Sequence, residues 1–296
     1  MNASRFLDPR TLAAISDLGL LAKTVVDGFM LGAHQSPKSG AGLEFSQYRS
    51  YEPGDDLRRI DWKMYARSDR YYVREAEIET SIAIRFILDT SASMAHEDRG
   101  MSKFDYARFL VASLGFLAHN QGDAIGLSAI NHISPFSLAP KFEHQHLHLF
   151  LHHLEKLQPA GTWPKWLQLE GHFTGHSKRE MIILITDLHE VSKEIRDALS
   201  RLKAMKNEVS LIQILGRNEL DFGYTDTMTF EELETGRVMQ VNAKDIRKSY
   251  QINFRQHIEN LRKEMHDQDI SHELFAMDQP LDFALRKYLK QRARLG

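Results

Sequence analysis

The sequence predicts an α/β fold, in which an open, mostly parallel sheet carries helices on both faces behind an irregular N-terminal arm. Three short runs rich in β-branched residues, at 82–88, 181–186 and 209–215, have the length of buried strands. Segments with helical periodicity separate them, as a parallel sheet covered on both faces requires. Two runs end directly in an aspartate, Asp89 and Asp187. Open α/β sheets place their sites at this carboxyl edge.

The composition is that of an ordinary globular protein. The chain has 296 residues, 42% of them hydrophobic, which is enough for a full core. Its 38 basic and 40 acidic residues give a net charge of -2, so the overall charge does not indicate nucleic acid as a partner. The absence of cysteine excludes disulfides, thiolate zinc sites and cysteine nucleophiles. We find no signal peptide and no apolar run of about 18 residues, and therefore expect a soluble, cytoplasmic protein without a transmembrane segment.

We divide the chain into residues 1–77, a helix followed by a charged and aromatic arm, and residues 78–296, the α/β domain with its C-terminal extension. Asp8 and Pro9 form a helix start, and apolar residues recur at helical spacing until Gly19. A short extended piece is expected at 23–30. Glycine, proline and serine at 32–42 then predict a loop.

The block at 44–67 alternates charged and aromatic residues with neither helical nor strand periodicity. Basic and aromatic residues together can bind single-stranded nucleic acid, but four acidic residues among them would repel phosphate: Glu52, Asp55, Asp56 and Asp61. We favour an arm whose aromatic residues pack on the main domain and whose arginines pair with acidic residues: Arg49, Arg58 and Arg67. A strand is expected at 71–79.

The α/β domain continues with regular elements. Ser102 and Asp105 resemble a capping box and begin a helix whose apolar residues follow the helical period up to Leu117. Strands are expected at 125–130 and, as a short edge strand, at 134–138. A helix is expected at 143–157, with a turn at 159–162 behind it.

The helix at 143–157 is rich in histidine. Histidines four residues apart can hold zinc, but no acidic residue lies in the right place to complete such a site. We therefore interpret the histidines as a solvated polar face: His144, His148 and His152, with His146 and His153 beside them.

The remaining segments complete the sheet and extend it. A helix is expected at 191–205, and strands at 229–234 and 237–241 form a hairpin around Thr235 and Gly236. Asn242 caps a long helix that reaches Met265. A last strand at 272–277 and a terminal helix at 281–289 with a basic end follow.

Asp89, Ser91 and Ser93 place one carboxylate and two hydroxyls within five residues, a set of oxygens that suits a hard cation. In isolation such a turn is more often a helix cap. Further along the chain, Thr162 lies in a glycine-containing turn and Asp187 follows a buried strand, so the sheet would bring both to the same edge.

The pattern Asp-x-Ser-x-Ser, then Gly-Thr, then Thr-Asp after an apolar strand resembles the metal-ion-dependent adhesion site of von Willebrand factor A domains. The resemblance implies a von Willebrand A-like, Rossmann-like sheet. It also implies that a divalent cation is bound by five residues, which are Asp89, Ser91, Ser93, Thr162 and Asp187. Mg²⁺ is the ion expected first, before Mn²⁺ or Ca²⁺. Leu188 departs from the glycine that is frequent after this aspartate.

The arm carries a second resemblance. The residues Glu44-Phe45, Arg49-x-Tyr51-x-Pro53-Gly54-Asp55-Asp56-x-Arg58-x-Ile60-Asp61-Trp62 and Ala66-Arg67 are similar to the signature of the bacterial domain-of-unknown-function-58 family. Members of that family are thought to be adaptors or partners of MoxR-type AAA+ ATPases. Many have two N-terminal membrane helices, which this sequence lacks.

These observations predict a non-enzymatic, metal-dependent protein-interaction module. A cation held by three neutral hydroxyls and two carboxylates keeps an open position that attracts an acidic side chain of a partner. One alternative is a metal-dependent hydrolase, a phosphatase or nuclease, with His189 or Glu190 as general base. Another is nucleic-acid binding by the arm. In a purely structural interpretation, Ser91 and Ser93 would cap the next helix and Asp187 would pair with an arginine.

Overall fold

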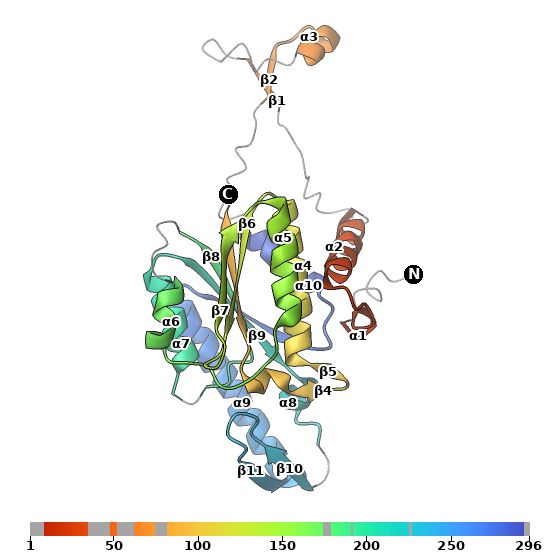
Figure 1. Cartoon of the computed structure of the whole chain (residues 1–296). Coiled ribbons are helices and arrows are strands. Elements are labelled where there is room, and N and C mark those ends of the chain that lie inside the picture. Colours follow the sequence, from red (N-terminus) through yellow and green to blue (C-terminus); the bar gives the residue numbers. More distant parts are fainter. Residues whose placement is uncertain are drawn as a thin grey trace. The chain divides into compact units, whose positions relative to one another are not determined.

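The chain divides into two compact units, residues 1–29 with 81–295, and residues 30–80. The computed structural model (Figure 1) describes residues 9–34, 48–51, 62–74, 82–173, 179–190, 192–224 and 227–292. Among these residues, no helix combines the length and apolar character needed to cross a membrane.

The larger unit is built on a six-stranded sheet, which confirms the predicted α/β class. Five strands are parallel and one edge strand, β7, is antiparallel. In spatial order the strands are β12 (Ser271–Ala276), β9 (Glu208–Leu215), β8 (Met181–Thr186), β3 (Ala83–Asp89), β6 (Ala124–Ile130) and β7 (Phe136–Lys141). The two central strands, β8 and β3, are buried almost throughout, because both faces of the sheet are covered.

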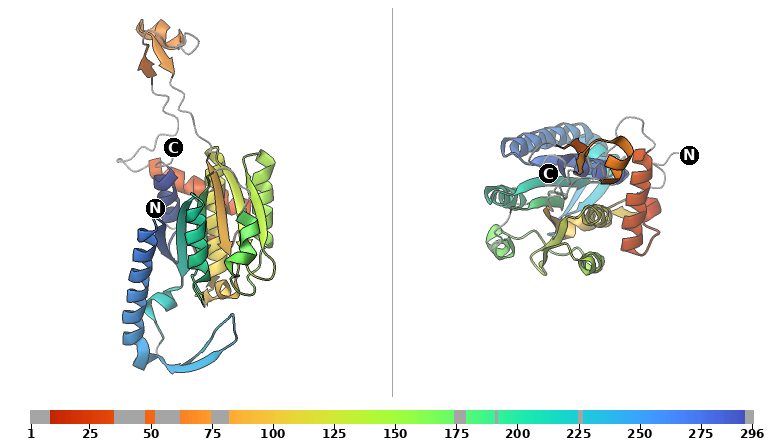
Figure 2. Two further views of the ribbon diagram at one scale, coloured as in Figure 1. Left: turned by 90° about the vertical axis from the view of Figure 1, so that its left-hand side faces the viewer. Right: turned by 90° about the horizontal axis from the view of Figure 1, so that it is seen from above.

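Helices cover both faces of the sheet (Figure 2). On one face lie α4 (Lys103–Asn120), α5 (His144–Lys156) and α10 (Asp282–Arg292), and the rings of Phe86 in β3 and Phe150 in α5 meet there at 5.9 Å. On the other face lie α6 (Trp166–Phe173), α7 (Glu194–Ala204) and α9 (Ala243–Asp267). Their apolar residues form one core cluster with Ile87 and Leu184 of the central strands.

The N-terminal segment corrects one prediction. Residues 23–30 are not extended: after the short α1 (Pro9–Leu12), they belong to α2 (Leu18–His34). Their β-branched residues favoured a strand, but the buried side chains recur at the helical spacing of three and four: Leu18, Leu21, Val25 and Phe29. The amide of Leu18 also donates to Glu155 in α5 at 3.1 Å. Residues 1–29 therefore belong to the larger unit, whereas the sequence-based division grouped them with the arm.

The smaller unit contains β1 (Tyr48–Ser50), α3 (Trp62–Ser68) and β2 (Tyr72–Arg74), and the two strands pair antiparallel. The helix α3 was not predicted. The rings of Tyr65 and Tyr71 stack at 4.5 Å, so these aromatic residues pack on each other. Of the three predicted arginine pairs, only Arg67 has a described side chain, and it is exposed. The side chain of Arg49 is not described, and Arg58, residues 35–42 of the predicted loop and residues 75–79 of the predicted strand lie outside the described residues.

The other predicted elements are present with small shifts. The caps are confirmed, since Ser102 accepts from the amide of Asp105 at 2.9 Å and Asn242 accepts from that of Lys244 at 3.2 Å. The hairpin consists of β10 (Thr227–Glu231) and β11 (Val238–Asn242). Two further helices were not predicted, α6 and the short α8 (Arg217–Asp221). Three histidines of α5 are exposed as predicted (His144, His148 and His152), whereas His146 is buried with its Nε2 at 2.8 Å from the carbonyl of Ile125.

Candidate metal centre

The sheet topology brings two aspartates together. From β3 the chain continues to β6 on one side, and later returns to β8 on the other side. Adjacent strands whose connections leave in opposite directions form a switch point, where the loops at the carboxyl ends diverge and leave a crevice. Asp89 ends β3 and Asp187 directly follows β8, so both lie at this switch point.

A continuous chain of hydrogen bonds joins four of the five predicted ligands. Asp89 accepts from the amide of Ser91 at 2.8 Å and from the hydroxyl of Thr186 at 2.6 Å. The hydroxyls of Ser91 and Ser93 are 3.0 Å apart, and Ser93 donates to Oδ1 of Asp187 at 3.1 Å. These four of the five predicted ligands are buried. The structure therefore assembles two carboxylates and two hydroxyls in one place.

Thr162, the fifth predicted ligand, lies beside this cluster without joining it. Its loop is attached to the first one, because the amide of Ala92 donates to the carbonyl of Gly161 at 2.8 Å. The hydroxyl of Thr162, however, lies 3.2 Å from Nδ1 of His132, and the amide of Thr162 donates to the same nitrogen at 2.9 Å. Gly161 has φ of 70°, and a Cβ there would come within 2.6 Å of the His132 ring, so only glycine fits this turn.

Lys103 is a charged member of the site that the sequence analysis missed. Its ammonium lies 2.8 Å from Oδ2 of Asp187 and 2.8 Å from Oε1 of Glu219. The side chain is 95% buried. Asp187 thus pairs with a lysine and not with the arginine of the structural interpretation. One signal was available, because a lysine directly after the N-cap Ser102 opposes the helix dipole unless a carboxylate faces it.

The two aspartates differ in charge environment. Burial and the nearby Asp187 carboxylate raise the pKa of Asp89 to about 7, although hydrogen bonds from Thr186 and Ser91 act in the opposite direction. Burial alone would also raise the pKa of Asp187, but the Lys103 ammonium and its hydrogen bond outweigh burial and lower it. In the part of the chain that the structure describes, Asp89 is contacted by neutral hydrogen-bond donors and forms no ion pair.

The donor set fits a hard divalent cation. All its side-chain donors are oxygens, as Mg²⁺ prefers, and the carboxylate of Asp89 has no counter-ion among the residues that the structure describes. The described residues contain no group of three His, Cys, Asp or Glu side chains that could hold a metal, so the hydroxyls are essential to this assignment. The cap interpretation loses support, since Ser91 precedes a short 3₁₀ helix, Ala92–Ala95, and makes no side-chain capping bond.

The two residues considered as general bases have structural roles. Glu190 accepts from the amides of Ile195 and Arg196 at 3.0 and 3.3 Å and forms an ion pair with the Arg196 side chain, so it holds the start of α7. His189 lies with Nε2 at 3.3 Å from Oε1 of Glu232 in the β10–β11 hairpin.

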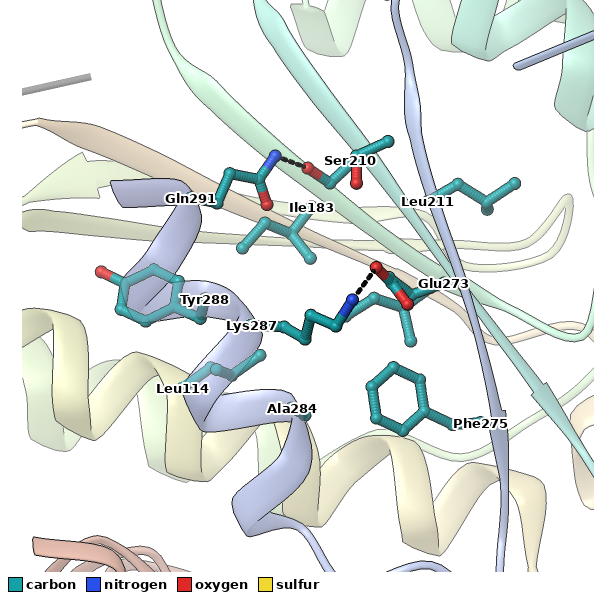
Figure 3. A pocket seen from close by; sticks show the side chains of 12 residues that line it. Leu114, Ile183, Ser210, Leu211, Glu273, Phe275, Ala284, Lys287, Tyr288 and Gln291 are labelled. Atoms are coloured by element: carbon teal, nitrogen blue, oxygen red, sulfur yellow. Dashed lines mark hydrogen bonds and ion pairs between the residues drawn. The ribbon is translucent and has the colours of Figure 1, made fainter. Parts of the chain in front are cut away.

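A separate pocket lies between the sheet and helices α4 and α10 (Figure 3). Lys287 pairs with Glu273 there at 2.7 Å, and Gln291 donates to Ser210. Its cavity of about 30 Å³ has room for one or two water molecules. None of the predicted metal ligands lines it, so it is not part of the metal centre.

Comparison with known proteins gives relatives of similar length. Two of them, the uncharacterized proteins Rv1480 of Mycobacterium tuberculosis and Mb1516 of Mycobacterium bovis, are each 26% identical over 236 residues, which cover 79% of this chain and 74% of theirs.

Solved structures also resemble this chain. BatB from Bacteroides thetaiotaomicron has a TM-score of 0.47 at 18% identity and covers 72% of this chain and 100% of its own. The SpRpn10 VWA domain has a TM-score of 0.42 at 14% identity, and the match covers 70% of this chain and 95% of that domain. At such values these two neighbours say nothing about what this chain binds.

A family model shows which protein family the chain belongs to. The model described as "Protein of unknown function DUF58" matches residues 47–260, which include the described parts of the arm, the sheet from β3 to β9 and all five predicted ligands. The resemblance noted in the arm is thereby confirmed, and the chain belongs to the DUF58 family.

Proposed function

We propose that this chain is a non-enzymatic protein-interaction module whose site holds a divalent cation, and that the cation binds an acidic side chain of a partner protein. Mg²⁺ is the simplest candidate, because it takes oxygen ligands and is abundant. Asp89, Ser91, Ser93 and Asp187 would hold it, with Thr162 brought in by its adjoining loop. The cation would supply a positive charge at the sheet edge for the partner's carboxylate.

The observation that carries this proposal is the environment of Asp89. A fully buried carboxylate without an ion pair is costly in the absence of a positive charge, and its raised pKa expresses that cost. A bound cation would remove the cost. Lys103 cannot do so for both aspartates, because its ammonium is shared between Asp187 and Glu219.

The proposed partner is a MoxR-type AAA+ ATPase with an exposed Asp or Glu, and this rests on the resemblance of the arm to its family. No observation favours a hydrolase, since His189 and Glu190 are both engaged in contacts that hold loops and helices. Tyr65 and Tyr71 of the arm stack on each other, so these two rings give no support to nucleic-acid binding.

The experiment is a thermal unfolding titration of the whole chain with Mg²⁺. A ligand that binds only the folded state at 100 times its Kd stabilises by about 2.7 kcal/mol, so the midpoint should rise by several degrees. Asp89→Ala should remove the rise, because it deletes the buried carboxylate. The exposed Glu259→Ala in α9 is the control and should retain it. An unchanged midpoint of the wild type at millimolar Mg²⁺ contradicts the proposal.

A chelator experiment tests the partner. Capture of the ATPase by the immobilised chain should be lost on chelation of divalent cations and restored by Mg²⁺. Capture that persists in chelator, or that Asp89→Ala leaves intact, shows that the partner binds elsewhere.

A further inference from the structure

Three loops meet at the carboxyl edge of the sheet, and backbone hydrogen bonds join them. The loop after β3 is bonded to residues 159–162, since the amide of Ala160 donates to the carbonyl of Thr90 at 2.8 Å. The loop between β6 and β7 is bonded to the same segment, because the amide of His132 donates to the carbonyl of Thr162 at 3.0 Å. Thr162 is therefore held in place by both neighbouring loops.

A buried side chain fixes the turn that carries His132. Asn131 is 2% exposed, and its Nδ2 donates to the hydroxyl of Thr90 at 2.9 Å. Its Oδ1 accepts from the amide of Ile133 at 2.9 Å, which closes the turn. Because Thr90 directly follows Asp89, this turn is anchored next to the metal centre.

The ring nitrogen Nδ1 of His132 is a hydrogen-bond acceptor. The backbone amide of Thr162, which can only donate, lies 2.9 Å from it, so Nδ1 carries no proton. The carbonyl of Thr162 lies farther from the same nitrogen, at 3.4 Å, and could accept only from a protonated Nδ1, which the closer amide excludes. The proton of the neutral ring is therefore on Nε2.

This tautomer decides the direction of the Thr162 hydroxyl. Its Oγ1 lies 3.2 Å from Nδ1 of His132, and between a hydroxyl and an unprotonated nitrogen the hydroxyl must donate. Since the hydroxyl proton points to the ring, both lone pairs of Oγ1 remain available. A cation is bound through such lone pairs, so the oxygen has the orientation that a ligand needs.

A threonine hydroxyl without this partner has no fixed orientation. It rotates to suit its surroundings, and in some of its rotamers the proton faces the cation and is repelled by it. The His132 ring excludes these rotamers before a cation arrives. Partners behind the ligands commonly orient metal sites in this way.

We propose that His132 is a positioning residue of the metal centre: it accepts the hydroxyl proton of Thr162 and so presents Oγ1 to the bound cation as an acceptor. This inference rests on the proposed function of the same site. It gives a role to an exposed side chain that is not itself a ligand.

The first experiment needs no cation. In nitrogen NMR of the whole chain with isotope-labelled histidine, at mildly alkaline pH and without divalent cations, His132 should have an unprotonated Nδ1 and a protonated Nε2. The chain has 15 histidines, and the resonances that disappear in His132→Asn identify this ring. A proton on Nδ1 would overturn the inference.

The second experiment compares two variants of similar shape. His132→Asn has an acceptor oxygen at the position of Nδ1, whereas His132→Leu has a methyl group there. Binding of Mn²⁺ to the whole chain is measured from the electron paramagnetic resonance signal of the free ion. His132→Leu should weaken it about tenfold, the lower end of the usual effect of a lost partner behind a metal ligand. His132→Asn should bind nearly as tightly as the wild type.

A double-mutant cycle tests whether His132 acts through Thr162. Thr162→Val removes the hydroxyl and keeps the branched shape of the side chain. Adding His132→Leu to Thr162→Val should cause no further loss of Mn²⁺ affinity, because the ring then has no hydroxyl to orient. Additive losses would show that His132 affects the site by another route, and would overturn the inference.

Two results distinguish the role of His132 from the function on which it rests. If His132→Leu binds Mn²⁺ as the wild type does while Asp89→Ala does not, the metal site stands and the role of His132 is overturned. If the wild type binds no Mn²⁺, the proposed function is overturned and the role of His132 with it, even when the ring has the expected tautomer.

Discussion

Leu188 has a backbone conformation that leucine rarely adopts. Its φ is 60°, in the left-handed region, which costs a non-glycine residue about 1–2 kcal/mol. Two contacts retain it there. Its amide donates to the hydroxyl of Thr186 at 2.9 Å, and its buried side chain joins the cluster that contains Trp163 and Ile195. The same hydroxyl donates to Asp89, so the turn at Leu188 helps to orient the metal centre.

At Leu188 a glycine variant should be more stable than an alanine variant, which reverses the usual order of stability. Leu188→Ala loses the buried side chain and keeps the left-handed strain, so the free energy of unfolding should fall by about 2–4 kcal/mol. Leu188→Gly loses the same contacts but relieves the strain, and should be about 1 kcal/mol more stable than the alanine variant. Urea unfolding of both variants measures this. An alanine variant as stable as the glycine variant would show that the turn carries no strain.

Single residues also show what could be predicted. Asp89, Ser91, Ser93 and Asp187 were predictable because each follows directly from where a buried strand ends. The direction of the Thr162 hydroxyl was not predictable from the sequence. It depends on the His132 ring, which comes from the loop between β6 and β7. Lys103 reaches the site from a helix start, and its distance from the site is set by tertiary packing that no local pattern encodes.

At the scale of elements, strands were predicted better than helices. Buried strands of a parallel sheet are continuous apolar runs, and β3, β8 and β9 were all recognisable for this reason. The helix α2 was missed because its β-branched residues favour strands while its apolar spacing favours a helix, and packing against α5 decides between them. The short helix α8 has no buried residues, so no apolar period marked it.

The edge strand β12 carries a pH-sensitive histidine. His272 has Nε2 at 3.1 Å from Oε1 of Gln213 in β9, and its Nδ1 is buried with no hydrogen-bond partner in the described parts of the chain. Burial, and secondarily the charge of Arg262, lower the pKa of His272 to about 4. A proton on the ring would therefore be unfavourable in the folded state.

This shift predicts a loss of stability in mild acid. As the pH falls below the ordinary histidine value of about 6.5, the unfolded state takes up a proton that the folded state does not bind until about pH 4. Between these values the unfolded state binds more protons, so stability decreases as the pH falls. His272→Gln should reduce the loss between pH 7 and pH 5 by on the order of 1–2 kcal/mol, measured by urea unfolding.

The control is an exposed histidine of α5. His148→Gln should leave the pH dependence as in the wild type. The prediction is contradicted if the stability of His272→Gln changes with pH as steeply as that of His148→Gln. The ring of His272 would then take up its proton in the folded state as readily as in the unfolded state.

At the scale of the whole molecule, the larger unit is discontinuous in sequence. Residues 1–29 and 81–295 form one unit, and residues 30–80 between them form the other. The N-terminal part of α2 contributes fully buried side chains to the larger unit, among them Leu21 and Val25. Each fully buried side chain of this kind contributes about 1.5–3 kcal/mol, and several together favour association without a covalent link.

Cutting the chain tests this directly. A specific protease site placed between residues 40 and 41 of the whole chain divides it into fragments 1–40 and 41–296. After cleavage the two fragments should elute together in size-exclusion chromatography at micromolar concentration, because the buried face of α2 still holds the first to the second. Val25→Asp places a charge in that face and should release the short fragment, whereas Thr24→Asp places the same charge on an exposed residue and should not. Release of fragment 1–40 from the wild type would mean that α2 is held only by its chain connection, and that the sequence-based boundary near residue 77 describes the molecule better.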